Sequence, residues 1–401
     1  MKKLLKCGVL FTGKEVIKNG AVVIDGETIV DVGTLDQITV PEDCEVLDLQ
    51  DQFVMAGLID AHTHFTVSAQ NPGYVAGQKD PNEKKVLRAA RNMRIDLKTG
   101  VTTIRCLGEQ DFLDVIMKEA IESGMIPGPR ALISGYGLKP SFGHGVMAAP
   151  FDGCDEVVKA VRTNIQAGAD QIKLFVTGNE EDFSTFKFGA GRAIEKYDMH
   201  SMFTPEEIQA AIDIAHGAGR KVAAHCYGGL GARLLIEAGL DTLEHGIYLE
   251  QEEIDMMVEA GTWLTLTMNA YFNDERLANR GTPDQVKGFV KYRSDIQKNL
   301  QNAVSSGVKF MVGTDGQHGA LISELELIVD LLGVSNELAL KAATCNAAEA
   351  CGVADKIGTI EAGKLADIIS VQGNPLNDIS DMHKVNVILK GGCRVDTLSD
   401  L

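Results

Sequence analysis

A regular alternation of strand-like and helix-like segments across residues 53–355 constrains the fold of this chain more than any other feature. Most segments between the strands are amphipathic, as in residues 205–215, where Thr204 can cap a helix that has proline at its first position. Such alternation is typical of a parallel sheet, and eight units in about 300 residues predict an α/β fold, the closed (β/α)8 TIM barrel. An open doubly wound sheet would need a glycine-rich phosphate turn after the first strand, and the sequence has none there. The eight expected strands span residues 54–64, 101–107, 131–135, 171–176, 222–225, 242–245, 263–267 and 310–313.

Both ends of the chain have a different character, with short β-branched runs separated by turns. Asp25-Gly26 stands between two such runs, which is a strong hairpin signal. Residues 366–371 and 385–390 have the same pattern near the other end. We therefore expect a small β-sandwich domain built from residues 1–53 together with 358–401, and a barrel domain at 54–357.

Composition limits the partners of the chain. Lys and Arg number 38 against 56 Asp and Glu, a net charge of −18, which argues against nucleic acid or an anionic membrane as a partner. No run of about 18 apolar residues is present, so we expect no membrane span. The eight cysteines are scattered and lack a Cys-x-x-Cys pair, which favours reduced thiols in the cytoplasm and argues against a thiolate zinc site. A small-molecule substrate and a homo-oligomeric assembly are the partners that we expect.

Histidines and one carboxylate stand at the ends of several expected strands. His62 and His64 are two residues apart at the end of the first strand and can share one face. His225, His245 and Asp315 end three later strands. Each alone is readily explained as a hydrogen-bonded core histidine or a capping aspartate. Because the C-terminal ends of barrel strands converge on the active-site mouth, the set together predicts a site for zinc, manganese or iron.

Lys173 is unusual because it lies inside an apolar strand, where an uncompensated ammonium is costly. One interpretation is a lysine paired with a buried carboxylate. The alternative is a side chain carboxylated by CO₂, which needs the neutral amine and produces an anion able to bridge two cations.

The order of motifs resembles the amidohydrolase superfamily over essentially the whole chain. Within it, the chain looks most like the prolidase-like branch, which hydrolyses Xaa-Pro dipeptides and other N-acyl amino acids. His144 and the His225-Cys-Tyr227 run are the features of that branch. The motifs that carry the resemblance are VMAGLIDAHTH at 54–64, GVTTIR at 100–105, QIK at 171–173, VAAH at 222–225, LEHG at 243–246, GTD at 313–315, AATCNAA at 342–348 and GTIEAGKLAD at 358–367.

This resemblance implies a pair of divalent metal ions, with zinc the expected metal. His62 and His64 would bind the more buried ion, which Asp315 would also bind, and His225 and His245 would bind the more exposed one. Carboxylated Lys173 would bridge the two. The ligand set implied is thus His62, His64, Lys173, His225, His245 and Asp315.

The same resemblance implies a mechanism in which a metal-bridging hydroxide attacks an amide carbonyl. Asp315 would take the proton of the attacking hydroxide and deliver it to the leaving amine. His144 would hold the developing oxyanion, and the alternative interpretation is a loop histidine. Tyr227 shares a strand face with His225 and would bind the substrate carboxylate, unless it only packs in the core.

Two departures leave the substrate open. Cys106 stands where relatives often have aspartate, and residues 179–203 form a long polar stretch that we interpret as a lid or binding element. A superfamily deaminase or a cyclic amide hydrolase acting on a heterocycle is the main alternative, although such deaminases usually hold one metal and lack a bridging lysine. An esterase or lactonase and a barrel without catalysis are the remaining alternatives.

Overall fold

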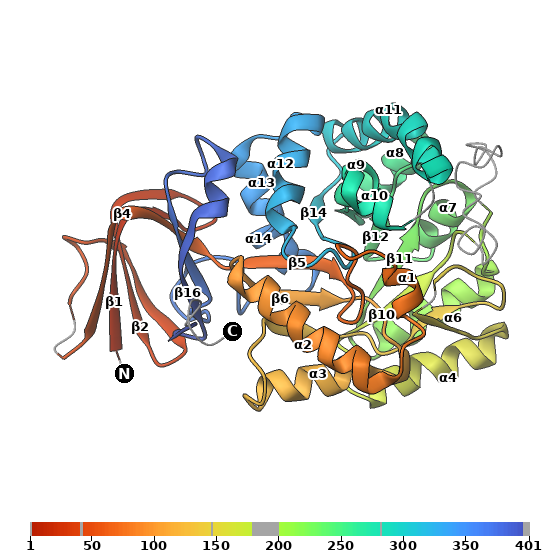
Figure 1. The fold of residues 1–401 in the computed structure, drawn as a ribbon, viewed down its shortest axis with the longest axis horizontal. Helices are drawn as coiled ribbons and strands as arrows, with labels where there is room; N and C mark the ends of the chain where they lie inside the picture. The colour runs from red at the N-terminus through yellow and green to blue at the C-terminus, as the bar shows by residue number, and fades with distance from the viewer. Residues whose placement is uncertain (1, 41–42, 146, 179–199, 281–282, 396–401) are drawn as a thin grey trace.

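The structure is a computed structural model that describes residues 2–40, 43–145, 147–178, 200–280 and 283–395. Figure 1 shows two parts: a sheet made from both ends of the chain, and a larger unit of strands surrounded by helices. Among the described residues, no helix combines the length and the apolar character that a bilayer span requires.

The larger unit is the predicted barrel. Its strands pair in parallel in two sheets, in the order β5-β6-β7 and β14-β13-β12-β11-β10-β8-β9. Their bounds are Leu58–Thr63 (β5), Val101–Cys106 (β6), Arg130–Leu132 (β7), Gly137–Lys139 (β8), Ala148–Pro150 (β9), Gln171–Phe175 (β10), Lys221–Cys226 (β11), Thr242–His245 (β12), Trp263–Leu266 (β13) and Phe310–Val312 (β14).

Two further connections close the barrel. The amide of Asp315, just beyond β14, donates to the carbonyl of His62 in β5 at 2.7 Å. Gly313 lies so close to β5 that a Cβ atom there would meet the backbone of His62 at 2.5 Å, which explains the absence of a side chain at that position. On the opposite side the amide of Asp170, just before β10, donates to Ile133, which follows β7.

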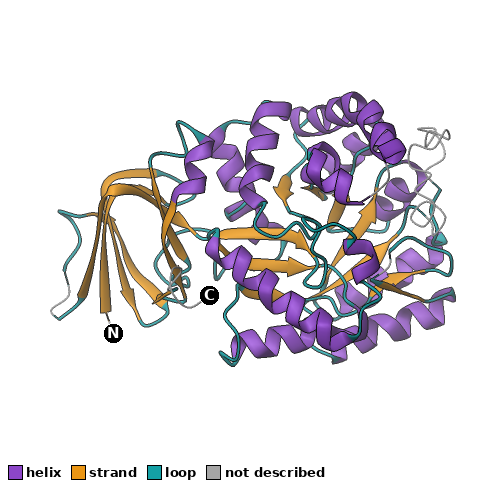
Figure 2. Ribbon diagram, viewed as in Figure 1, coloured by secondary structure: helices purple, strands orange, loops and turns teal. Residues whose placement is uncertain are grey.

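Helices surround the strands, as Figure 2 shows. Their buried positions recur at helical spacing; in α4, Val157, Ala160, Val161 and Asn164 face the barrel. The cap predicted for the helix that begins at Pro205 is confirmed: Thr204 and Glu207 form a reciprocal capping box. The longer helices are Asn82–Lys98 (α2), Leu113–Glu122 (α3), Gly153–Gln166 (α4), Pro205–Gly217 (α6), Gly229–Glu237 (α7), Gln251–Ala260 (α8), Pro283–Ser305 (α11) and Leu321–Leu332 (α12). The shorter ones are Tyr74–Gly77 (α1), Asn269–Phe272 (α9), Asp274–Arg280 (α10), Asn336–Ala342 (α13) and Cys345–Ala350 (α14), with 3-10 turns at Gln110–Phe112 (η1) and Ile379–Lys384 (η2).

The two ends of the chain form one seven-stranded sheet, in the order β17-β16-β15-β4-β1-β2-β3. Its strands are Lys2–Phe11 (β1), Val16–Asp25 (β2), Thr28–Thr34 (β3), Glu45–Ala56 (β4), Ile368–Gln372 (β15), Val385–Lys390 (β16) and Cys393–Arg394 (β17). The hairpin expected around Asp25-Gly26 joins β2 to β3. Consequently the small β domain contributed by both termini is present.

Side-chain alternation gives this sheet two apolar faces. Phe53 and Met55 of β4 pack with the core of the barrel, whereas Val54 and Ala56 belong to a separate cluster inside the terminal sheet. The sheet folds on itself around that second cluster, because the amide of Ile29 in β3 donates to the carbonyl of Lys364, which precedes β15. The terminal domain therefore has its own core and also closes the barrel on one side.

Two expected strands differ by three or more residues at one end from those in the structure. Residues 54–56 pair with β15 rather than beginning the first barrel strand. The chain changes sheets at Gly57, where a Cβ atom would collide with Thr102. The third strand, expected at 131–135, is divided between β7 and β8, and β8 makes the pairing with β10. The domain boundaries at 53/54 and 357/358 stay a prediction.

Candidate active site

The six candidate ligands come from five strands and gather at one end of the barrel. His62 lies in β5 and His64 follows it directly; His225 lies in β11, His245 ends β12, and Asp315 follows β14. These five line one pocket. Lys173 lies below them in the middle of β10, fully buried. The structure thus brings together the residues that sequence reasoning selected.

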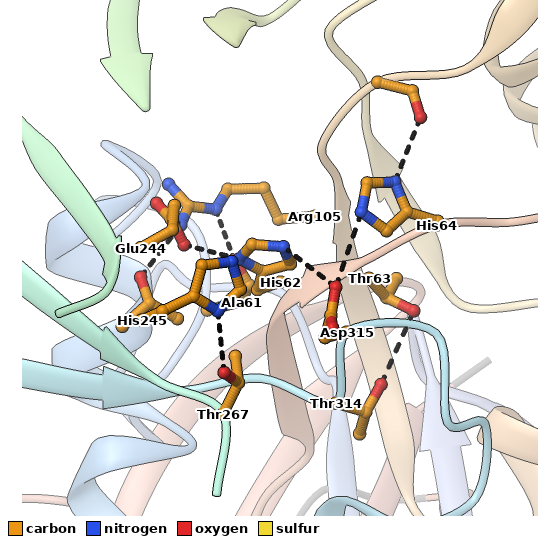
Figure 3. A network of polar contacts seen from close by, with 12 residues as sticks. Ala61, His62, Thr63, His64, Arg105, Glu244, His245, Thr267, Thr314 and Asp315 are labelled. Atoms are coloured by element: carbon orange, nitrogen blue, oxygen red, sulfur yellow. Dashed lines mark hydrogen bonds and ion pairs between the residues drawn. The ribbon is translucent and has the colours of Figure 1, made fainter. Parts of the chain in front are cut away.

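His62 is oriented by a buried ion pair (Figure 3). Its Nδ1 lies 2.7 Å from Oε2 of Glu244, and Oε1 of Glu244 accepts from Nη2 of Arg105 at 2.9 Å. Burial alone would raise the pKa of Glu244, but Arg105 and His62 hold it well below its ordinary value. An ionised Glu244 therefore accepts the Nδ1 proton and leaves Nε2 of His62 free to face the pocket.

Two other histidines are oriented in the same way. Nδ1 of His64 lies 3.1 Å from the carbonyl oxygen of Gly108, and Nδ1 of His245 lies 2.8 Å from Oγ1 of Thr267. Burial lowers the pKa of His64 to about 3 and that of His245 well below 6.5. Both rings are therefore neutral. Because the carbonyl of Gly108 can only accept, Nδ1 of His64 carries the proton and its Nε2 is available as a donor atom for a metal.

Asp315 points one oxygen at this cluster. Its Oδ1 lies 3.5 Å from Nε2 of His62 and 3.6 Å from Nε2 of His64. Its Oδ2 accepts from Nη2 of the buried Arg276 at 2.7 Å. Although burial raises the pKa of Asp315, Arg276 and His62 more than offset that and hold it well below 3.8. Ligand atoms of His62, His245 and Asp315 all lie within 4.8 Å of one another, so these side chains converge closely enough for metal ions to bind among them.

Two of these residues have unusual backbone conformations. His245 has φ of 77° and Asp315 has φ of 51°. Both values lie in the left-handed region, which residues other than glycine rarely adopt. Each such residue costs on the order of 1–3 kcal/mol and persists where the surroundings impose it, often at active sites. Both are candidate ligands that line the pocket, so part of the backbone strain of the described residues lies at the candidate site.

Lys173 has no hydrogen-bond partner for its Nζ among the described residues. Burial lowers its pKa to about 8 from 10.5. Of the carboxylates near it, Glu244 is engaged by His62 and Arg105. The structure therefore does not show the buried lysine–carboxylate pair that was one of the two interpretations of Lys173.

His225 connects the candidate ligands to the two predicted substrate-binding residues. Its ring stacks on that of His144, with centroids 4.4 Å apart and planes at 16°, and meets the edge of Tyr227 at 4.6 Å. His144 and Tyr227 both line the pocket. Nε2 of His225 is buried without a partner among the described residues, and burial lowers the pKa of this ring well below 6.5. A ring in this state can donate its lone pair to a metal.

Sequence reasoning missed the residues that orient this cluster, namely Arg105, Glu244, Thr267 and Arg276. Glu244 carried one usable signal, because it is a charged residue inside a barrel strand directly before a candidate ligand. Cys106 is buried with its Sγ 3.8 Å from Oε1 of Glu109, and it is not among the residues that line the pocket. Most of the stretch predicted to be a lid, residues 179–199, lies outside the described residues.

Comparisons with known proteins agree with this geometry. The amidohydrolase family profile matches residues 53–394. By sequence, the chain is similar to ochratoxinase from Aspergillus niger, with 28% identity over 431 residues that cover 97% of this chain and 85% of that protein.

By structure, the chain is similar to a Xaa-Pro dipeptidase with methionine bound in its active site. The TM-score is 0.85 at 30% identity, over 98% of this chain and 100% of that one. It is also similar to a prolidase complexed with N-methylphosphonate-L-proline, with a TM-score of 0.85 at 28% identity over 98% and 99% of the two chains. Both likenesses span the barrel and the terminal sheet together.

Proposed function

Since the chain belongs to the amidohydrolase family and is a metal-dependent amidohydrolase, we propose that it uses two divalent metal ions to cleave the amide bond of an Xaa-Pro-like dipeptide or an N-acyl amino acid. The proposal extends the family chemistry to a particular metal centre and substrate class. It is supported by the site geometry and by the kinship with a Xaa-Pro dipeptidase and a prolidase.

The observation that carries the proposal is Lys173, a fully buried amine without a hydrogen-bond partner among the described residues. Burial is the main cause of the lowered pKa values of His64, His225 and His245, and the positive charge of Lys173 lowers all three further. An unmodified ammonium there would repel the cations that the histidines attract. Carboxylation by CO₂ turns the neutral amine into an anion, and this reverses the sign of the interaction.

The donor set fits two divalent ions. His62 and His64, together with Oδ1 of Asp315, would hold one ion, and His225 and His245 would hold the second, with carboxylated Lys173 between them. Neutral imidazoles and carboxylates suit zinc, which we expect to be the metal, as well as manganese and iron. When bound, the ions would supply Lewis acidity, which lowers the pKa of a shared water and polarises the substrate carbonyl.

Residues of the chain would carry out proton transfer, oxyanion stabilisation and substrate binding. Asp315 accepts the proton of the attacking water and returns it to the leaving nitrogen. Arg276 fixes Oδ2 of Asp315 and thereby directs Oδ1 toward the histidines. His144 donates a hydrogen bond to the developing oxyanion, and Tyr227 binds the substrate carboxylate.

The pocket wall is consistent with a substrate that carries an apolar group. Val67, Met147 and Phe175 supply apolar surface, and Tyr74 and Tyr271 add aromatic surface with polar tips. This lining favours dipeptides and N-acyl amino acids with apolar side chains over strongly charged ones.

A substrate screen tests the proposal. Zinc-reconstituted enzyme is incubated with panels of Xaa-Pro dipeptides, N-acyl amino acids, cyclic amides and amino-heterocycles, and the release of amine or ammonia is scored. We expect turnover of one of the first two panels, bound metal near two per chain, and loss of activity in a chelator. The His62→Asn variant should lose metal and activity, whereas His216→Asn, at a half-exposed histidine outside the site, should keep both. Turnover confined to the heterocycle or cyclic amide panel, or one metal per chain, would contradict the proposal.

A further inference from the structure

His64 lies beyond the end of its strand, so sheet pairing does not hold its backbone. β5 ends at Thr63, whose carbonyl still accepts from the amide of Leu107 at 3.0 Å. Beyond that point the ring of His64 is oriented through Gly108, but its main chain enters the loop that continues to Val67. Contacts outside the hydrogen bonds of the sheet must therefore fix the position of the His64 imidazole.

His318, in the loop after β14, contacts the main chain around His64. Its Nε2 lies 2.9 Å from the carbonyl oxygen of Val67 and 3.2 Å from that of His64. Carbonyl oxygens only accept, so Nε2 carries a proton and donates to both. The imidazole is buried, and it bridges a loop carrying one candidate ligand to the loop that carries Asp315.

Asp96, near the end of α2, fixes His318 in turn. Its Oδ2 lies 2.6 Å from Nδ1 of His318, and its Oδ1 accepts from the amide of Gly319 at 2.9 Å. One carboxylate therefore holds both the ring and the adjoining backbone, and all of these groups are buried or partly buried. Three segments that are distant in the sequence are joined at one point directly behind the candidate ligands.

We propose that His318 is a positioning residue for the metal centre: by donating from Nε2 to the carbonyls of His64 and Val67, it sets the distance between His64 and Asp315. This inference rests on the ligand role proposed above for His64 and Asp315, whose Nε2 and Oδ1 are 3.6 Å apart. His318 touches neither metal nor substrate. Groups that orient metal ligands in this indirect way typically account for about 10- to 100-fold in metal affinity.

Two substitutions separate positioning from simple core filling. In His318→Gln the amide nitrogen can reach the place of Nε2 and still donate to the carbonyls, although the contact with Asp96 is lost. In His318→Asn the amide takes the place of Nδ1, so the contact with Asp96 remains and the carbonyls lose their donor. We expect His318→Asn to lower zinc and cobalt affinity about 10- to 100-fold and His318→Gln to lower it by less than about fivefold. The readouts are competition with a chromophoric chelator, the visible spectrum of the cobalt-loaded protein and the melting temperature of the metal-free protein.

The same pair of changes at His216 is a matched control. His216 is half-exposed, and its Nε2 contacts Asp241 at 2.8 Å, away from the pocket. Both His216 variants should keep the metal affinity and the cobalt spectrum of the unmodified protein. Equal metal affinity in the two His318 variants, or losses that merely follow their melting temperatures, would overturn the proposal.

Two further variants complete the test. If His318→Asn does not fold, Asp96→Asn replaces it: an amide there can donate to Nδ1 of a neutral His318 that keeps its Nε2 proton. Metal affinity should then stay within about threefold, and a larger loss would refute the role assigned to Nε2. His64→Ala distinguishes the two proposals, because unchanged metal binding in that variant removes the proposed function itself. Lost binding in His64→Ala with normal binding in His318→Asn removes only the positioning role.

Discussion

Burying the Lys173 amine beneath the histidines should have two consequences: a cost in stability and the formation of the metal centre. Replacing Lys173 with methionine separates them. Methionine fills a similar volume, cannot be carboxylated and carries no charge. An amine whose pKa falls from 10.5 to about 8 on folding costs the metal-free, CO₂-free protein about 3 kcal/mol at pH 7. We therefore expect the metal-free variant to be more stable by about 2–3 kcal/mol near pH 7 and yet to lose its catalytic metal centre.

The pH dependence of stability follows from the direction in which folding shifts the pKa of Lys173, which is downward. Between pH 8 and 10.5 the unfolded chain binds more protons at Lys173 than the folded chain does, so stability rises with pH through this window. Below pH 8 the cost is present in full. The methionine variant should lack this rise, because it has no proton to lose.

Chemical unfolding of metal-free protein in CO₂-depleted buffer, repeated from pH 6 to 11, measures the first consequence. Metal stoichiometry and kcat/KM of zinc-reconstituted protein measure the second. Bound metal should fall from two per chain to one or none, and kcat/KM should fall by at least about 10³-fold, or about 4 kcal/mol of transition-state stabilisation. Lys221→Met is the matched control, since Lys221 begins the neighbouring strand β11 and should show neither effect.

Either of two results would refute this reasoning. Two bound metals and full activity in Lys173→Met would show that the amine does not bridge a metal pair. Unchanged stability with an unchanged pH profile would show that the amine does not carry the desolvation cost that its burial implies.

The remaining predictions concern two residues that contact candidate ligands and one buried carboxyl group. Glu244→Gln removes the anionic acceptor of His62 Nδ1, and we expect chelator competition to show about a 10- to 100-fold loss of metal affinity; unchanged affinity would show that packing alone orients the ring. Thr267→Val removes the hydroxyl next to His245 Nδ1 at nearly constant volume, so metal affinity should fall by about tenfold, read by the same competition assay; a normal cobalt spectrum would count against this. Burial raises the pKa of Glu109 to about 7 from 4.5, so the folded state binds the extra proton and stability falls as pH rises through that interval. Glu109→Gln should flatten that part of a melting-temperature series against pH, and parallel curves would contradict the assignment.

The candidate ligands at strand ends could be predicted because the C-terminal ends of barrel strands lie together at the mouth. His62, His225 and Asp315 are far apart in the sequence, yet each stands where a parallel strand ends. Such ends meet at one mouth of the barrel, so the sequence alone identifies candidate ligands. The resemblance of the motifs to the amidohydrolase superfamily is confirmed by the family match over residues 53–394.

Local backbone conformation could not be predicted in the same way. Glu244 and His245 are adjacent in β12, so strand alternation would place them on opposite faces. Instead Glu244 reaches His62 inside the barrel while His245, with φ of 77°, still lines the pocket. The change of sheet at Gly57 also depends on local packing, because a Cβ atom there would collide with the side chain of Thr102.

The pairing of β4 with β15 has a consequence for how the chain is made. β1–β4 are synthesised before the barrel, while β15, the partner of the second edge of β4, is encoded only after the entire barrel. Until then that edge presents free amide and carbonyl groups, which is the kind of surface that draws in strands from other molecules. A nascent chain that stalls before residue 368 would keep this edge uncovered, so we expect such chains to be more prone to aggregation.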